Sequence, residues 1–120
     1  MEFNQFVQKL KAALPPGIKL SNPRKGITTI ISYTNGNLKY KRGETTFYVA
    51  ILTFYEAFQK YKGRRVSSND LKQFAPNVFA RERGHSCNCS MFFLALQSIG
   101  IIDKINGSGN PGDPFWVRIP

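Results

Sequence analysis

The amino-acid sequence predicts a single domain of the α+β class. Its 120 residues match the length of one domain, and apolar residues make up 42% of them, which is enough for a buried core. Apolar residues recur at helical spacing in four segments, and two further segments alternate apolar and polar residues beside turn residues. Helices and antiparallel hairpins in one chain of this length are typical of an α+β domain.

The first predicted element is an amphipathic helix over residues 3–14. Its apolar stripe consists of Phe3, Phe6, Val7, Leu10 and Leu14. Pro15 and Pro16 end this helix because proline cannot continue one. Residues 15–26 are rich in proline, glycine and lysine, and we expect them to form a linker.

A β-hairpin is predicted over residues 27–42. Asn35 and Gly36 are a preferred pair for a two-residue type I′ turn, because both residue types tolerate a positive φ. The turn sets a register with these cross-strand pairs: Tyr33 with Leu38, and Ile31 with Tyr40. We expect these four side chains to share the buried face of the hairpin.

The opposite face of the hairpin is predicted to be basic. It carries Ile30, Ser32, Lys39 and Lys41, and it lies beside Arg42. A strand face with this charge is expected to meet solvent or a polyanion.

Two helices are predicted next. The first covers residues 44–62 and ends at Gly63, and its apolar stripe consists of Phe47, Ile51, Phe54, Phe58 and Tyr61. We expect this aromatic stripe to be core and not a base-stacking surface. The second covers residues 67–75. Ser67 is expected to cap it with Asp70 in a capping box, Val66 and Leu71 are expected to form a hydrophobic staple, and Pro76 ends it.

The last third of the chain is predicted to contain a fourth helix and a second hairpin. Residues 77–85 are predicted to have no regular secondary structure. The helix begins near Ser86 or Asn88 and ends at Gly100, with Phe92, Phe93, Leu96 and Ile99 facing inward. Residues 101–105 and 115–119 are predicted to be the two strands of the hairpin, joined by a glycine- and asparagine-rich loop.

The charge of the chain predicts an anionic partner. Lys and Arg number 17 against 7 Asp and Glu, so the formal net charge is +10. Six of the cations fall between residues 19 and 42 without any acid among them. Nucleic acid is the usual partner of a clustered excess of this size.

The order of elements over residues 44–119 resembles the winged helix-turn-helix superfamily. The residues that carry the resemblance are the capped helix at Ser67, the helix ending in Leu96, Ile99 and Gly100, and the hairpin that follows. The resemblance implies that residues 43–62 form the scaffolding helix, 67–75 the bracing helix, 86–99 the recognition helix and 101–119 the wing. The connection between residues 76 and 85 is longer than in most helix-turn-helix units. Residues 1–43 are then an N-terminal extension of the same domain.

This arrangement implies duplex DNA as the partner and nominates three groups of contact residues. We expect the recognition helix and the residues before it to read bases and contact phosphate through His85, Ser86, Asn88, Ser90, Arg81 and Arg83. The start of the bracing helix is expected to contact phosphate through Arg64, Arg65, Ser67 and Ser68, although Ser67 also suits simple capping. The wing tip and the basic hairpin add Asn106, Ser108, Lys39, Lys41 and Arg42.

Metal binding, cofactor binding and catalysis are not expected. Cys87 and Cys89 are separated by one residue, and His85 is the only histidine, so a four-ligand zinc site lacks partners. The seven acids form no recognisable magnesium-binding pattern, and no nucleophile–histidine–acid motif is present. The sequence shows no secretory signal, which predicts a cytoplasmic protein, associated with the nucleoid or located in the nucleus according to its host.

Two other functions remain open at this point. The chain ends directly after a predicted strand, which favours a specificity module of a larger nucleic-acid enzyme such as a restriction endonuclease. The winged-helix superfamily also includes RNA-binding and protein-interaction domains. Oligomeric state is not predicted by any of these patterns.

Overall fold

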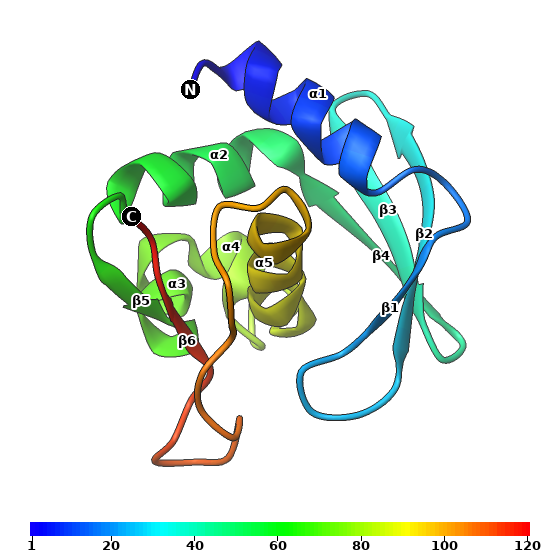
Figure 1. Ribbon diagram of the computed structural model, residues 1–120. Helices are drawn as coiled ribbons and strands as arrows, with labels where there is room; N and C mark the ends of the chain where they lie inside the picture. The colour runs from blue at the N-terminus through cyan, green and yellow to red at the C-terminus, as the bar shows by residue number, and fades with distance from the viewer.

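The fold is mixed α+β, as the sequence predicts. The computed structural model describes residues 1–120 and contains five helices, a four-stranded antiparallel sheet and a two-stranded antiparallel sheet (Figure 1). The helices are α1 (Phe3–Ala13), α2 (Ile51–Lys60), α3 (Ser68–Phe74), α4 (Pro76–Phe79) and α5 (Cys87–Ser98). The strands are β1 (Lys19–Ser21), β2 (Ile27–Thr34), β3 (Asn37–Arg42), β4 (Thr45–Ala50), β5 (Arg65–Ser67) and β6 (Trp116–Arg118).

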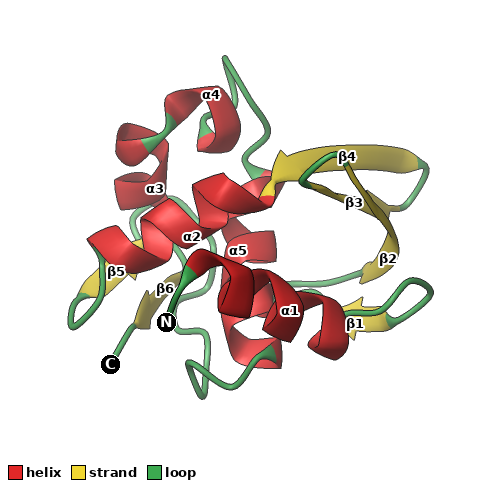
Figure 2. Ribbon diagram, turned by 90° about the horizontal axis from the view of Figure 1, so that it is seen from above, coloured by secondary structure: helices red, strands yellow, loops and turns green.

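The four-stranded sheet curves around one end of the helices. Its strand order is β1-β2-β3-β4, and each strand is antiparallel to its neighbour. Figure 2 shows α1, α2 and α5 on the concave side of the curved sheet, whereas the convex side faces away from them. The core lies between the sheet and these helices, because the buried strand residues and the buried helix residues form one apolar cluster.

The predicted hairpin is confirmed, but part of its register is wrong. Asn35 and Gly36 have positive φ values of 53° and 78°, and Tyr33 pairs with Leu38 as expected. A β-bulge between Ile30 and Ser32 then adds one residue to β2, so that Tyr40 pairs with Ile30. Because one extra residue exchanges the faces of a strand, Ile30 is buried and Ile31 is only half-buried.

The predicted helix over residues 44–62 begins seven residues later than expected. Thr45–Ala50 is strand β4, which pairs along the whole of β3, and Gly43 forms the intervening turn with φ 58°. Phe47 and Val49 are buried while Tyr48 is exposed, which is the period of a strand. Phe47 stands four residues before Ile51, so it fits a helical stripe by coincidence.

The segment predicted to be a linker, residues 15–26, contains a strand. Lys19–Ser21 pairs with β2 as an edge strand, and Gly17 and Ile18 exchange backbone hydrogen bonds with Ile30 before it. Strand β2 has backbone groups on both edges that need partners, and β1 supplies them on one edge. The proline and glycine content of the segment reflects its turns and not a lack of structure.

The capped helix is confirmed in detail. Ser67 Oγ accepts a hydrogen bond of 3.1 Å from the Asp70 N–H, and the Ser67 N–H donates one of 2.8 Å to Asp70 Oδ2. Val66 and Leu71 are fully buried, consistent with the predicted staple. Pro76 ends this helix but also begins the short helix α4, so the connection predicted to be irregular contains a helical turn.

The C-terminal hairpin is largely wrong as predicted. Residues 101–105 form no strand, and β6 pairs with β5 through the central pair Val66 and Val117. The N–H groups of Ile101 and Ile102 both donate to the carbonyl oxygen of Leu96, which closes the end of α5. Those groups are therefore not free for a strand ladder, and a single bridge between Asn106 and Trp116 remains of the predicted pairing.

Helix α5 is the central helix of the domain. Its buried residues are Asn88, Cys89, Met91, Phe92, Phe93, Leu94, Ala95 and Leu96. A helix that is buried on nearly all sides is a core element, whereas a recognition helix needs one exposed polar face. The expected DNA-reading helix is thus largely enclosed by its own protein.

Candidate functional site

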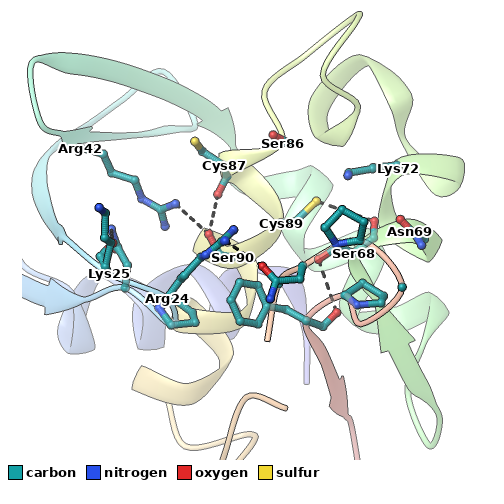
Figure 3. A pocket seen from close by; sticks show the side chains of 18 residues that line it. Arg24, Lys25, Arg42, Ser68, Asn69, Lys72, Ser86, Cys87, Cys89 and Ser90 are labelled. Atoms are coloured by element: carbon teal, nitrogen blue, oxygen red, sulfur yellow. Dashed lines mark hydrogen bonds between the residues drawn. The ribbon is translucent and has the colours of Figure 1, made fainter. Parts of the chain in front are cut away.

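A basic cleft of about 460 Å³ opens between the four-stranded sheet and the helical half of the chain. Its walls come from the β1–β2 loop, the end of β3, the start of α3, the start of α5 and the loop before β6 (Figure 3). None of its 18 lining residues is Asp or Glu, and four of them are cations: Arg24, Lys25, Arg42 and Lys72. Figure 3 shows Arg42 and Lys25 on one side and Lys72 on the other. We refer to this site as the basic cleft.

Arg42 is the most firmly held cation of the basic cleft. Its Nε donates to Thr28 Oγ1 at 2.7 Å, and its Nη1 donates to Ser90 Oγ at 2.8 Å. Its Nη2 is sealed from solvent and has no hydrogen-bond partner. Desolvation of a guanidinium that has no carboxylate partner is unfavourable, and an anion in the cleft would offset part of that penalty.

The position of Arg42 corrects the expected grouping with Lys39 and Lys41. Arg42 lies over the ring of buried Tyr40 at 5.5 Å, so it belongs to the concave side of the sheet. Lys39 and Lys41 alternate with Tyr40 and Arg42 along β3 and therefore point to the convex side. One strand thus presents cations to two separate surfaces.

Arg24 joins the two halves of the molecule across the basic cleft. Its Nη2 donates to Asn110 Oδ1 at 2.8 Å, which connects the β1–β2 loop to the loop before β6. Asn110 is a neutral acceptor, so the charge of Arg24 remains available to an anion. Arg24 was not among the predicted contacts, because the 86 positions that separate it from Asn110 leave no local pattern to detect.

The start of α3 contributes to the basic cleft mainly through Asn69 and Lys72. Ser67 was expected to contact phosphate, but its hydroxyl donates to Asp70 Oδ2 at 3.0 Å and accepts from the Asp70 N–H. Ser68 lines the cleft, yet it is 9% exposed and its N–H and hydroxyl both donate to the Phe115 carbonyl oxygen. The side chains of both serines are thus hydrogen-bonded within the protein, which leaves Asn69 and Lys72 as the residues of α3 that can contact a ligand.

Asn88 is not a base-reading residue in this fold. Its side chain is 2% exposed, and its Oδ1 accepts a hydrogen bond of 2.6 Å from the Tyr40 hydroxyl. Its Nδ2 donates to the Val78 carbonyl oxygen at 2.9 Å. The predicted base contact is wrong because the sequence around a polar residue at a helix start is the same whether its side chain faces solvent or bridges two core elements.

Of the other residues expected at the start of α5, two line the basic cleft. Ser86 is exposed there, and Ser90 lies deeper and accepts from Arg42 while donating to the Cys87 carbonyl oxygen at 3.2 Å. His85 is exposed outside the cleft, with its ring edge-on to Phe47.

The remaining predicted contact residues lie outside the lining of the basic cleft. Arg81 and Arg83 are exposed in the loop before α5. Arg64 and Arg65 are exposed at β5, where the Arg65 guanidinium stacks 3.9 Å from the Trp116 ring. In the loop before β6, the side chain of Asn106 donates to the Trp116 carbonyl oxygen, and the hydroxyl of Ser108 accepts from the Asn110 N–H.

Cys87 and Cys89 line the basic cleft as free thiols in different environments. Burial raises the pKa of Cys89 to about 12, and its thiol lies within hydrogen-bond distance of the Ser68 and Phe79 carbonyl oxygens. Cys87 is half-buried. No group of three or more His, Cys, Asp or Glu side chains is placed to hold a metal ion.

We expect iodoacetamide at pH 8 to label Cys87 well before Cys89. Alkylation requires an accessible thiolate, and Cys89 is 3% exposed and protonated at this pH. Mass spectrometry of the peptide that contains both residues, taken over a time course, measures the order of labelling. Equal rates for the two thiols in the folded protein would contradict the enclosed position of Cys89, whereas equal rates in denaturant are expected.

Comparison with protein-family models, with curated proteins and with solved structures found no match to this chain. None of the five helices combines the length and the apolar character that crossing a bilayer requires.

Proposed function

We propose that this protein binds duplex DNA and that the basic cleft holds phosphates of the DNA backbone. The observation that carries the proposal is the convergence of Arg24, Lys25, Arg42 and Lys72 from three separate segments on one cleft without a carboxylate. Phosphate contacts of this kind provide most of the affinity of nucleic-acid binding and position the protein on the duplex.

We further propose that residues 51–119 form a winged-helix-like unit. The order α2, β5, α3, α4, α5, loop and β6 supports it, as does the antiparallel pairing of β5 with β6. Because α5 is largely buried, base contacts are assigned to exposed polar residues at the rim of the basic cleft. These are Asn69, Ser86 and Asn110, whose side chains can donate to or accept from base edges.

The loop before α5 extends this contact surface in the proposal. Arg81, Arg83 and His85 are exposed on the segment that leads directly into Ser86. Exposed cations on a segment next to the basic cleft are suited to contacts with neighbouring phosphates.

The proposal assigns binding and not catalysis to the basic cleft. Its lining contains neither histidine nor a carboxylate, so Cys87 and the serines have no general base beside them there. The same lining offers no carboxylates to hold magnesium, which the common nucleases require.

A salt series with a random duplex library tests the proposal. Four phosphate contacts predict a roughly hundredfold loss of affinity between 50 and 200 mM salt. Fluorescence anisotropy measures that loss, and sequencing of the bound fraction measures sequence preference. Affinity that does not change with salt, or no binding at 50 mM salt, would exclude phosphate capture by the cleft.

A further inference from the structure

The convex face of the four-stranded sheet is a second surface with the character of a binding site. Figure 2 shows no helix packed against this side of the sheet. Its residues alternate along the strands with the buried core residues: Lys19, Thr29, Ile31, Lys39, Lys41 and Tyr48. We call this surface the convex face.

The convex face is basic, and no carboxylate on its strands offsets the charge. Strands β1 to β4 contain no Asp or Glu. Lys19 and Lys41 both pair with Thr29 across the sheet, one on each side of it. A depression of about 410 Å³ lies at this row, and it is also lined by Ile27 and Ile31. Two lysines therefore flank a depression lined by Thr29 and two isoleucines.

An exposed aromatic ring stands on the neighbouring part of the same face. Tyr48 is 57% exposed, and its hydroxyl makes no hydrogen bond within the protein. It is the cross-strand partner of Lys39, whose Nζ lies 5.4 Å from the centre of the ring. The other four tyrosines each donate a hydrogen bond from the hydroxyl and are buried or half-buried.

We infer that the convex face binds single-stranded nucleic acid, with an unpaired base stacked on Tyr48 and phosphates on Lys39, Lys41 and Lys19. An aromatic side chain on an open sheet, next to cations, is the combination that unpaired nucleotides require. Lys39 and Lys41 are two residues apart on β3, roughly 7 Å along the strand, so they can meet successive phosphates. A paired base in a duplex is already stacked on its neighbours and does not offer its face to the ring.

This inference does not depend on the proposed binding of duplex DNA by the basic cleft. None of Lys19, Lys39, Lys41 and Tyr48 lines the cleft. The two surfaces are on opposite sides of β3, where Lys41 faces outward and Arg42 inward. Each can therefore be changed without touching the other.

The test measures anisotropy of a labelled single-stranded 12-mer of mixed sequence and of a labelled 20-base-pair duplex. Tyr48→Leu is expected to weaken single-strand binding about tenfold, which is within the range for loss of one base–aromatic stack. Tyr48→Phe keeps the ring and is expected to remain within about twofold of the natural protein. For the single strand, the slope of log affinity against log salt concentration is expected to fall by about 1.4 in the double variant Lys39→Gln with Lys41→Gln, since each lost phosphate contact removes about 0.7. Thermal melting checks that the variants remain folded.

Three outcomes would overturn the inference. The first is that the natural protein does not bind the single strand. The second is that Tyr48→Leu binds it as tightly as the natural protein does. The third is that Tyr48→Phe loses as much affinity as Tyr48→Leu. If the duplex does not bind while Tyr48→Leu still weakens single-strand binding, the proposed function fails and this inference stands. If the duplex binds and single-strand binding depends only on Arg24 and Lys72, the inference fails and the proposed function stands.

Discussion

Replacing Arg24, Lys25 and Lys72 together by glutamine is expected to lower the affinity for duplex DNA at least a hundredfold at 0.1 M salt. Each lost phosphate contact removes about 0.9 from the slope of log K against log salt, so the slope should fall by about 2.7. The three side chains line the basic cleft from the β1–β2 loop and from α3, and none has a carboxylate partner there. Anisotropy titrations at several salt concentrations measure both the affinity and the slope. Arg42 is left unchanged because its hydrogen bonds to Thr28 and Ser90 also hold the fold.

A matched variant separates the site from the overall charge. Lys9, Lys60 and Lys104 are exposed and lie outside the basic cleft, and their replacement by glutamine removes the same three charges. We expect this variant to lose less than tenfold in affinity, because long-range attraction is screened at 0.1 M salt. Equal losses in the two variants would show that net charge, and not the cleft, determines binding.

The second large effect is expected in stability. Asn88→Ala should lower the free energy of unfolding by about 2–4 kcal/mol, because it leaves the Tyr40 hydroxyl without its acceptor and the Val78 carbonyl oxygen without its side-chain donor. Unsatisfied polar groups in the interior lose their hydration without compensation. Urea denaturation followed by the fluorescence of Trp116, the only tryptophan, measures the change.

Ser86→Ala is the control for this prediction, because Ser86 is an exposed residue two positions away that makes no side-chain cap for α5. Its effect on the free energy of unfolding should be within about 0.5 kcal/mol. Tyr40→Phe combined with Asn88→Leu removes both partners of one hydrogen bond and should destabilise less than the separate effects added together. If Asn88→Ala left stability unchanged but altered the preferred DNA sequence, the residue would be a base reader after all.

Local signals in the sequence predicted the elements that depend on neighbouring residues. The stripe of α1, the Asn35-Gly36 turn and the capping box at Ser67 were all correctly predicted. Each is determined by side chains within a few positions, through helical spacing, positive φ or a short hydrogen bond. The end of α5 at Gly100, with φ 83°, is a further case.

The errors fall where pairing with another strand decides the outcome. Thr45–Ala50 became a strand because β3 pairs with it, although Phe47 also suited a helical stripe. The return strand β6 found its partner in β5, about 50 residues earlier, and not in the nearby segment 101–105. The β-bulge in β2 exchanged the faces of Ile30 and Ile31, which no rule based on turn length anticipates.

The candidate site shows the same division. Composition and local patterns were enough to predict a strongly basic α+β domain with a run of cations between residues 19 and 42 and serines at two helix starts. Which cations lie together is set by the folded chain: Arg42 lies with Arg24, Lys25 and Lys72 around the basic cleft, whereas Lys39 and Lys41 point to the convex face. Alternation along a strand sends neighbours in sequence to opposite faces of the sheet, while folding brings Arg24 to Asn110 across 86 positions. The charged side chains can be counted in a sequence, but the surface to which each one points is set by packing.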